Sequence, residues 1–367
     1  MAKETKTTNG LSIDYIIHPG STLAEVLEDR HMSQKELSVR TDVTAKHIST
    51  IIAGEKGISV SFAKKLEYAL GIEAQFWINL QSTYDREMLE YEDAHSITDE
   101  ETSILKQLKE VIDDFRERGW ISANSKDALV LEMRSLLQVS NLCNIPKIPC
   151  AAAYRVDSTA AVNPYVLFAW QKMCEKQAME SLYTLTECEL NLLKLQESIN
   201  EIKSSMFLTA DNMRKKLKMI FSQCGIVFDV VQNYKGAPVQ GYIKEVDNKM
   251  LLCITLRRKY MDVFWFTLFH EIGHILNGDT KNVFIDFENE YNQSEVAADT
   301  FARDALINPE TYRNFIDTNR ADLRSIKKLA QDNNVDASIV IGRLMKDGLL
   351  EWNEYSEYRK KYVWKKS

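Results

Sequence analysis

The chain has 367 residues, a formal net charge of -7, 45% hydrophobic residues and 27% charged residues. This composition is that of an ordinary globular protein and excludes a largely disordered chain. The length exceeds what one hydrophobic core usually supports, so we expect two or three domains. A net acidic chain is repelled on average by a phosphate backbone, so any contact with nucleic acid must come from a local patch.

The sequence carries no membrane or disulfide signal. No apolar run approaches the roughly 18 residues that span a bilayer, and the opening residues MAKETKTTNG lack the apolar core of a signal peptide. The six cysteines never form a CxxC pair, which favours thiols over disulfides or a zinc knuckle. We therefore expect a cytoplasmic protein with no membrane partner.

Residues 21–80 are predicted to form a series of short amphipathic helices. Ser33 and Thr44 are predicted helix caps, Glu36 completes a capping box with Ser33, and Gly71 falls where a helix should stop. The segments SQKELSVRT and TAKHISTIIAGE are joined by a short turn. They have the length and spacing of a helix-turn-helix, in which the second helix enters the major groove of DNA.

The helix-turn-helix pattern separates core positions from outward ones. The predicted core positions are Leu37, Val43, Ile48, Ile51 and Ile52. The outward side chains are candidates for contact with DNA bases or phosphates: Gln34, Lys35, Thr44, Ala45, Lys46, His47, Ser49 and Thr50. A small helical bundle with a solvated face is the alternative, because basic side chains barely outnumber acidic ones in residues 33–56.

The wider segment from HPG to FWINLQSTYD resembles the HigA-type antitoxin regulators of the XRE class. The resemblance is carried by the HPG opening, the SQKEL helix, the ISTIIAGEKGIS passage and the FWINLQ run. It implies that residues 1–86 form a helix-turn-helix DNA-binding domain. It also implies a homodimer that binds a double-stranded, palindromic DNA operator.

Residues 87–204 are predicted to be a mainly helical middle region, interrupted at residues 144–158, where two prolines favour an extended connector. The period of the apolar residues then changes from about 3.6 to 2 at GIVFDVV, VQGYIKEV and MLLCITL, which is typical of strands. Asp247 and Asn248 resemble a hairpin turn. The sequence therefore predicts a mainly α chain with a small antiparallel β-sheet (α+β).

The segment WFTLFHEIGHILNGD places His270 and His274 four residues apart, with Glu271 directly after the first. Its apolar residues predict a helix that ends at Asn277-Gly278. Positions i and i+4 share one helix face, so the two imidazoles can hold one metal ion, while Glu271, rotated by about 100°, can take a proton from water. The alternative is a structural helix, but two histidines beside a carboxylate are costly to bury without a metal or other partners.

A catalytic zinc needs a third protein ligand, and the remaining histidines all lie far upstream, so we expect a carboxylate. Glu295 is favoured because it opens the next predicted helix, SEVAADTFARDALI, with Ser294 as its cap. Asp299, one turn later, can orient a ligand histidine. Four other carboxylates remain candidates for the third ligand: Asp279, Asp286, Glu288 and Glu290.

The run from the sheet through FWFTLFHEIGHILNGD to EVAADTFARDALINP resembles the ImmA/IrrE family of metallopeptidases, whose motif pairs HExxH with a later E-x-x-A-(N/D)-x-F-A helix. The resemblance implies a zincin-like metallopeptidase domain over residues 205–367, with a helical C-terminal extension. It implies that His270, His274 and Glu295 hold Zn2+ and that Glu271 is the general base. Some members carry a further histidine soon after the motif, where this chain has Gly278.

Together these patterns predict a DNA-binding transcriptional regulator with a zinc-dependent endopeptidase domain. Its protein substrate is expected to be a repressor or the chain itself, in a stress, phage-response or toxin–antitoxin circuit in which a toxin is a candidate partner. We expect the substrate to lie along VQGYIKEV, taken as an edge strand. The alternative is a non-proteolytic HigA-like antitoxin or repressor whose metal domain is a sensor or a partner-binding platform. The helix-turn-helix-like period of SIKKLAQDNNVDASIVIGRLMKDG is attributed to packing.

Overall fold

The computed structural model describes residues 13–148, 153–156, 161–182, 189–246, 249–279, 293–318 and 321–363. The chain folds as two compact units. The first comprises Met1–Leu105 and Gly119–Ser135, and the second comprises Lys106–Arg118 and Leu136–Ser367. The domain boundaries after residues 86 and 204 remain predictions.

The predictions about membrane spans and about cysteines can be compared with the described residues. None of the described helices has the length and apolarity needed to cross a membrane. Cys150 and Cys188 lie outside the described residues. The prediction of thiols holds for the four cysteines that the structure describes, all of them free: Cys143, Cys174, Cys224 and Cys253.

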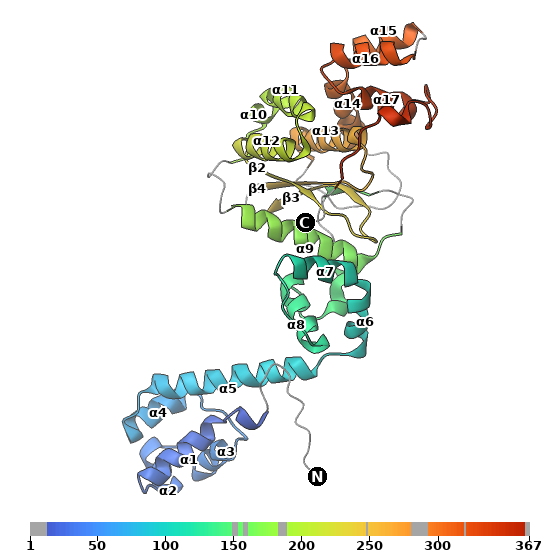
Figure 1. The fold of residues 1–367 in the computed structure, drawn as a ribbon. Coiled ribbons are helices and arrows are strands. Elements are labelled where there is room, and N and C mark those ends of the chain that lie inside the picture. Colours follow the sequence, from blue (N-terminus) through green and yellow to red (C-terminus); the bar gives the residue numbers. More distant parts are fainter. Residues whose placement is uncertain are drawn as a thin grey trace. The chain divides into compact units, whose positions relative to one another are not determined.

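The first unit starts with a helical bundle, shown in blue in Figure 1. Its helices are α1 (Pro19–Asp29), α2 (Gln34–Thr41), α3 (Ala45–Ile52), α4 (Val60–Leu70) and α5 (Ala74–His95), after a short 3-10 turn η1 (Ile13–Tyr15). The predicted core positions are confirmed: Leu37, Ile48 and Ile51 are fully buried, and Val43 and Ile52 pack against them.

Side-chain caps set the ends of α2 and α3. Ser33 Oγ accepts a hydrogen bond from Glu36 N at 3.1 Å, and Thr44 Oγ1 accepts one from His47 N at 3.2 Å, so both predicted caps are confirmed. The Glu36 carboxylate, expected to complete a capping box, pairs with Arg40 at 2.7 Å. Between the two helices Asp42 adopts the left-handed conformation, with φ of 51°.

A buried ion pair joins α6 (Asp99–Gln107) to α8 (Lys126–Leu137) within the first unit. Arg134 donates to both carboxylate oxygens of Glu101, at 3.0 and 2.6 Å, and Glu101 has no exposed surface. The bidentate geometry satisfies the carboxylate, which would otherwise be costly to bury.

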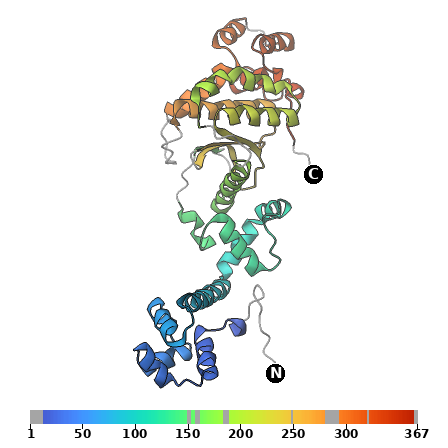
Figure 2. The same cartoon turned by 90° about the vertical axis from the view of Figure 1, so that its left-hand side faces the viewer.

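The second unit is built around a four-stranded sheet with strand order β1-β3-β4-β2. The strands are β1 (Ala153–Val156), β2 (Ile226–Val231), β3 (Val239–Val246) and β4 (Lys249–Thr255). Helix α9 (Pro164–Leu182) covers one face, and α12 (Ala210–Gln223) and α13 (Met261–Asn277) cover the other (Figures 1 and 2). The other elements before the sheet are α7 (Lys109–Glu117), η2 (Leu142–Lys147), α10 (Leu192–Glu197), α11 (Ile199–Ser204) and η3 (Ser205–Phe207).

The predicted small sheet is present, but it is mixed instead of antiparallel. β3 pairs antiparallel with β1 and β4, whereas β2 runs parallel to β4. Residues 232–238 carry the chain from β2 to the far side of β4, and Trp170 Nε1 donates to Gln232 O at 2.8 Å to hold the start of this loop on α9. Helices cover both faces of the sheet, so β2 is buried along its whole length, as is typical of parallel strands.

Two further predictions about the sheet need correction or completion. The edge-strand prediction for VQGYIKEV is wrong, because β3 pairs with β1 on one side and β4 on the other. The hairpin is confirmed by the pairing of Val246 with Lys249, while Asp247 and Asn248 lie outside the described residues. The predicted extended connector at 144–158 starts inside the 3-10 helix η2, and of its remainder the structure describes Ile148 and the strand β1.

The C-terminal part of the second unit is helical: α14 (Gln293–Leu306), α15 (Pro309–Asp317), α16 (Leu323–Asp332), α17 (Ala337–Lys346) and the 3-10 turn η5 (Ser356–Tyr358). α16 and α17 contribute to the same core as α13, which confirms the packing role of this segment. Gly278 ends α13 in the left-handed conformation, as predicted. Ser294 lies inside α14, so its predicted role as the cap is wrong.

Candidate metal centre

A close crossing of α13 and α14 creates the site. A Cβ built on Gly273 would lie 3.0 Å from Ala298 Cα and 3.3 Å from Ala298 O, so a side chain there would force the helices apart. α13 is buried along most of its length, and the backbone contact between Met261 N and Lys360 O at 2.9 Å holds its start. The crossing places the first turns of α14 against the histidine-bearing part of α13.

Three of the predicted ligands converge across this crossing. The Nε2 atoms of His270 and His274 lie 3.0 Å apart. Glu295 places Oε2 3.3 Å from His270 Nε2 and Oε1 3.2 Å from His274 Nε2. Among the described residues these three form the group of side chains that can hold a metal ion. Three of the alternative ligands, Asp286, Glu288 and Glu290, lie outside the described residues.

Two aspartates orient the imidazole rings. Asp299 Oδ1 lies 2.7 Å from His270 Nδ1, as predicted for a residue one turn after Glu295. Asp279 Oδ2 lies 3.2 Å from His274 Nδ1, so this residue contacts a histidine from behind and does not face the cluster. An ionised carboxylate can only accept, so both Nδ1 atoms must carry a proton, and the Nε2 atoms are then the ones that can bind a metal ion.

The donor atoms fit a zinc ion. Two Nε2 lone pairs and a carboxylate that face one another at 3.0 to 3.3 Å repel each other unless a cation lies between them. Ligand atoms at the usual zinc distances of roughly 2.0–2.1 Å, placed tetrahedrally, are about 3.3–3.4 Å apart, which is close to the observed spacing. The histidines are nearly buried, but the Glu295 side chain is 58% exposed, so the cluster is open to solvent on that side.

The close approach of these groups also shifts the pKa values of Glu295 and His274. When a proton on Nε2 takes the place of the metal ion, hydrogen bonds from His270, and next from His274, hold the pKa of Glu295 well below its ordinary value, so Glu295 is a carboxylate at neutral pH. Burial lowers the pKa of His274, but the hydrogen bond to Glu295 and the charge of Glu271 outweigh burial, and the net pKa is raised. The cluster therefore attracts a positive charge, whether a proton or a metal ion.

Glu271 lies beside the cluster and contacts the sheet. It is 2% exposed, and a Cβ built on Gly241 of β3 would lie 2.1 Å from its Oε1. The absence of a side chain at Gly241 thus makes room for the carboxylate. The sequence analysis did not single out Gly241, although an isolated glycine inside a strand is a known sign that another group approaches the backbone closely.

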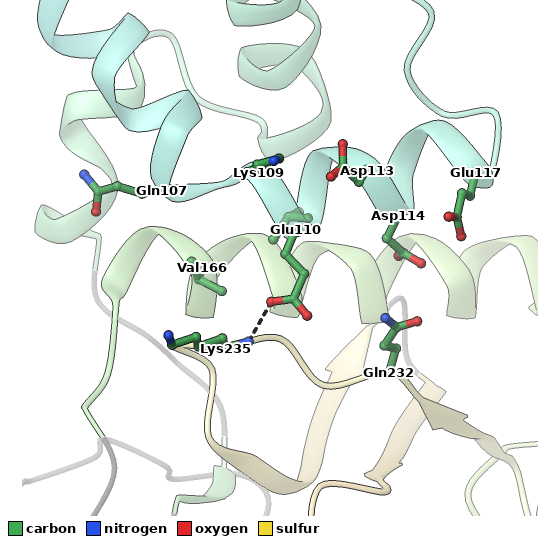
Figure 3. Close-up of a pocket in the computed structure, with 10 residues that line it drawn as sticks. Gln107, Lys109, Glu110, Asp113, Asp114, Glu117, Val166, Gln232 and Lys235 are labelled. Carbon is green, nitrogen blue, oxygen red and sulfur yellow. Dashed lines mark hydrogen bonds between the residues drawn. The ribbon is translucent and has the colours of Figure 1, made fainter. Parts of the chain in front are cut away.

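A separate hollow of about 460 Å³ lies between α7, α9 and the loop after β2 (Figure 3). Two of its four carboxylates, Glu110 and Asp114, have protein partners. Glu110 accepts from Lys235 N at 2.9 Å, and Asp114 accepts from Tyr234 Oη at 2.5 Å and from Arg118 Nε at 2.7 Å. We assign no ligand to this hollow, because these bonds give Glu110 and Asp114 structural roles.

The predicted DNA-contacting side chains divide into two groups. Thr44 and Thr50 bond to backbone groups of α3, and the His47 ring packs edge-on against Phe62 with 5.6 Å between centroids. These three therefore have structural uses within the first unit. The others are exposed on α2 and α3: Gln34, Lys35, Ala45, Lys46 and Ser49.

Two parts of the chain match known families. Residues 23–77 match the family described as helix-turn-helix, and residues 261–345 match the IrrE N-terminal-like domain of the M78 peptidases. Virulence-associated protein I of Dichelobacter nodosus is 35% identical over 82 residues, and this chain covers 75% of its length. The chain belongs to the XRE-type helix-turn-helix family and carries an IrrE-like domain. This XRE-type protein is therefore a DNA-binding regulator.

Other relatives of the XRE-type protein match between 18% and 29% of the chain. Virulence-associated protein A' of Dichelobacter nodosus is 36% identical over 69 residues and is covered to 60% of its length. The antitoxin HigA of Pseudomonas aeruginosa, solved with the higBA promoter, is 32% identical, with 23% of this chain and 96% of that chain covered and a TM-score of 0.21. A HigA-family antidote protein of Coxiella burnetii is 26% identical, with 29% and 97% covered and a TM-score of 0.19.

Proposed function

We propose that this XRE-type protein is a transcriptional regulator whose IrrE-like domain is a zinc-dependent endopeptidase. The convergence of His270 Nε2, His274 Nε2 and the Glu295 carboxylate, at separations of 3.0 to 3.3 Å, carries the proposal. The match of residues 261–345 to the M78 peptidases supports it. Glu271 supports the enzyme over a passive metal site, because a structural zinc needs no base beside it.

Each residue of the site has one task in this proposal. Zinc, when bound, supplies a Lewis acid that makes water more acidic and polarises a peptide carbonyl. His270, His274 and Glu295 would hold the ion, and Asp299 would keep the proton on His270 Nδ1. Glu271 accepts one proton of the attacking water and delivers it to the leaving amine nitrogen as the peptide C–N bond breaks.

In this proposal the first unit binds DNA. Exposed side chains on α2 and α3, including Lys35 and Lys46, would contact a double-stranded DNA operator, with the chain acting as a homodimer in the cytoplasm. The substrate would be a repressor protein or the chain itself, within a stress, phage-response or toxin–antitoxin circuit that can include a toxin. The similarity to an antitoxin and to an antidote protein of the HigA family supports the last of these circuits.

A cleavage screen with a matched inactive variant tests the proposal. The zinc-loaded full chain and its Glu271→Gln variant are incubated with the same cell extract, and new peptide N-termini are identified by mass spectrometry. We expect cleavage by the wild type and none by the variant, with equal zinc content in both. Zinc binding without any cleavage by the wild type would instead support the partner-binding platform. Equal cleavage by both proteins would refute the role of Glu271.

A further inference from the structure

A hollow of about 930 Å³ lies next to the proposed zinc site. It is lined by α13, α14, α17 and the segments around residues 258–260 and 352–359, together with Gln240 of β3. The hollow adjoins the site through three of its lining residues. Asp299 bonds to His270, Thr267 lies one turn before His270 on α13, and Gln240 precedes the glycine that contacts Glu271.

The carboxylates that line this hollow are engaged by protein partners. Asp262 pairs with Arg359 at 2.6 Å, and both are buried. Asp347 accepts from Arg343 Nε and from a tyrosine hydroxyl, both at 2.6 Å. Asp299 faces His270. The negative charges of the lining are therefore largely compensated from within the fold.

Two cations of the lining are not compensated in this way. Arg303 and Lys346 are exposed, and within the described part of the chain neither has a carboxylate partner. Apolar groups lie among them, notably Val263, Phe266 and the Trp352 side chain, which is 62% exposed. The hollow thus combines an apolar wall with uncompensated positive charge.

We propose that this hollow binds the substrate polypeptide on one side of the scissile bond and selects a segment in which an aspartate or glutamate alternates with apolar residues. Arg303 lies eight residues after the proposed ligand Glu295 on α14, a rise of about 12 Å. An extended peptide rises about 3.3 Å per residue, so the selected carboxylate lies about three to four residues from the bond that is cut. The proposal rests on the proposed peptidase function and adds the class of its substrate.

A binding measurement that requires no turnover tests the hollow directly. The zinc-loaded full chain carrying Glu271→Gln is titrated into a fluorescein-labelled decapeptide of alternating leucine and glutamate, and into its leucine–glutamine counterpart, with anisotropy as the readout. We expect the acidic peptide to bind at least about tenfold more tightly. The double substitution Arg303→Gln with Lys346→Gln should remove that difference.

A matched control separates the hollow from the overall charge of the protein. Arg324 and Lys328 on α16 are exposed and do not line the hollow, so Arg324→Gln with Lys328→Gln changes the net charge equally. This pair should leave the acidic preference within about twofold. Equal affinity of the two peptides, or an equal loss with the control pair, overturns the proposal.

A cleavage experiment distinguishes failure of the subsite from failure of the peptidase. Wild type is given a defined peptide library, and acidic residues should be enriched about three to four positions from the cut bond. Cleavage that depends on Glu271 but shows no acidic enrichment overturns the subsite and leaves the peptidase standing. Selective binding of the acidic peptide without any cleavage contradicts the peptidase and retains the hollow as a peptide-binding site.

Discussion

Replacing Gly241 by alanine should disable the proposed general base without touching the proposed metal ligands. A Cβ at this position would lie 2.1 Å from Glu271 Oε1 and 2.6 Å from Cδ. Ordinary contacts between such atoms are about 3.5 Å, so the carboxylate must move by more than about 1 Å. Gly241 is held by its pairing with Ile254 of β4, so the displacement must fall on Glu271.

The expected effect is large for the chemistry and small for the fold. A displacement of about 1 Å in a catalytic group can lower the rate about 100-fold, which corresponds to roughly 2.7 kcal/mol of transition-state stabilisation. We expect kcat/KM on an identified substrate to fall by about this factor. Zinc affinity, measured by competition with a chromogenic chelator, should stay within about twofold, because the substitution contacts neither His270 nor His274.

A double-mutant cycle decides whether the loss acts through Glu271. Gly241→Ala is introduced into wild type and into the Glu271→Gln variant, and the residual rates are compared. If the reasoning is correct, the glycine substitution costs little in the variant that already lacks the base. A loss of the same factor in both backgrounds, or unchanged activity in wild type, would refute it.

Three further predictions follow from the contacts described above. Asp299→Ala should weaken zinc binding about 10- to 100-fold, because it releases the His270 ring, and chelator competition checks this; unchanged affinity would contradict it. Glu101→Gln should lower the unfolding free energy by roughly 3–5 kcal/mol in urea denaturation, because it removes the negative charge that the buried Arg134 side chain contacts through two hydrogen bonds. Burial lowers the pKa of Lys203 to about 8, so the unfolded state binds more protons between about pH 8 and 10.5, and stability should rise with pH through that window. Lys203→Met should abolish this rise, so that across the window the unfolding free energy of wild type increases by roughly 1–3 kcal/mol more than that of the variant. An unchanged pH profile in the variant would contradict the role of Lys203.

Local features of the fold were predictable because short-range physics decides them. Ser33 and Thr44 cap their helices through backbone groups three residues away, and Gly278 ends α13 in a conformation that glycine adopts at low cost. The pairing of His270 with His274 follows from the helical period. Glu295 could be favoured as the third ligand because a carboxylate at the start of the next helix can lie beside the two histidines when the two helices pack together.

Strand order and the surroundings of the site were not predictable, because contacts between distant segments decide them. The apolar run of β2 fits a strand in either direction, and only its position next to β4 makes it parallel. β3 has a strand pattern whether or not another strand covers its edge, so the pairing of β1 was not visible. Asp279 could not be separated from the candidate ligands because its role depends on which ring nitrogen it faces.

X-ray absorption at the zinc edge tests the central claim most directly. For the purified chain with one equivalent of zinc, the spectrum should show two imidazole nitrogens and oxygen donors in a four-coordinate site. Glu295→Gln should alter the oxygen contribution while both imidazoles remain, and His274→Ala should remove one imidazole. A spectrum with sulfur ligands, or one that neither substitution changes, would contradict the assignment of His270, His274 and Glu295 as the metal ligands.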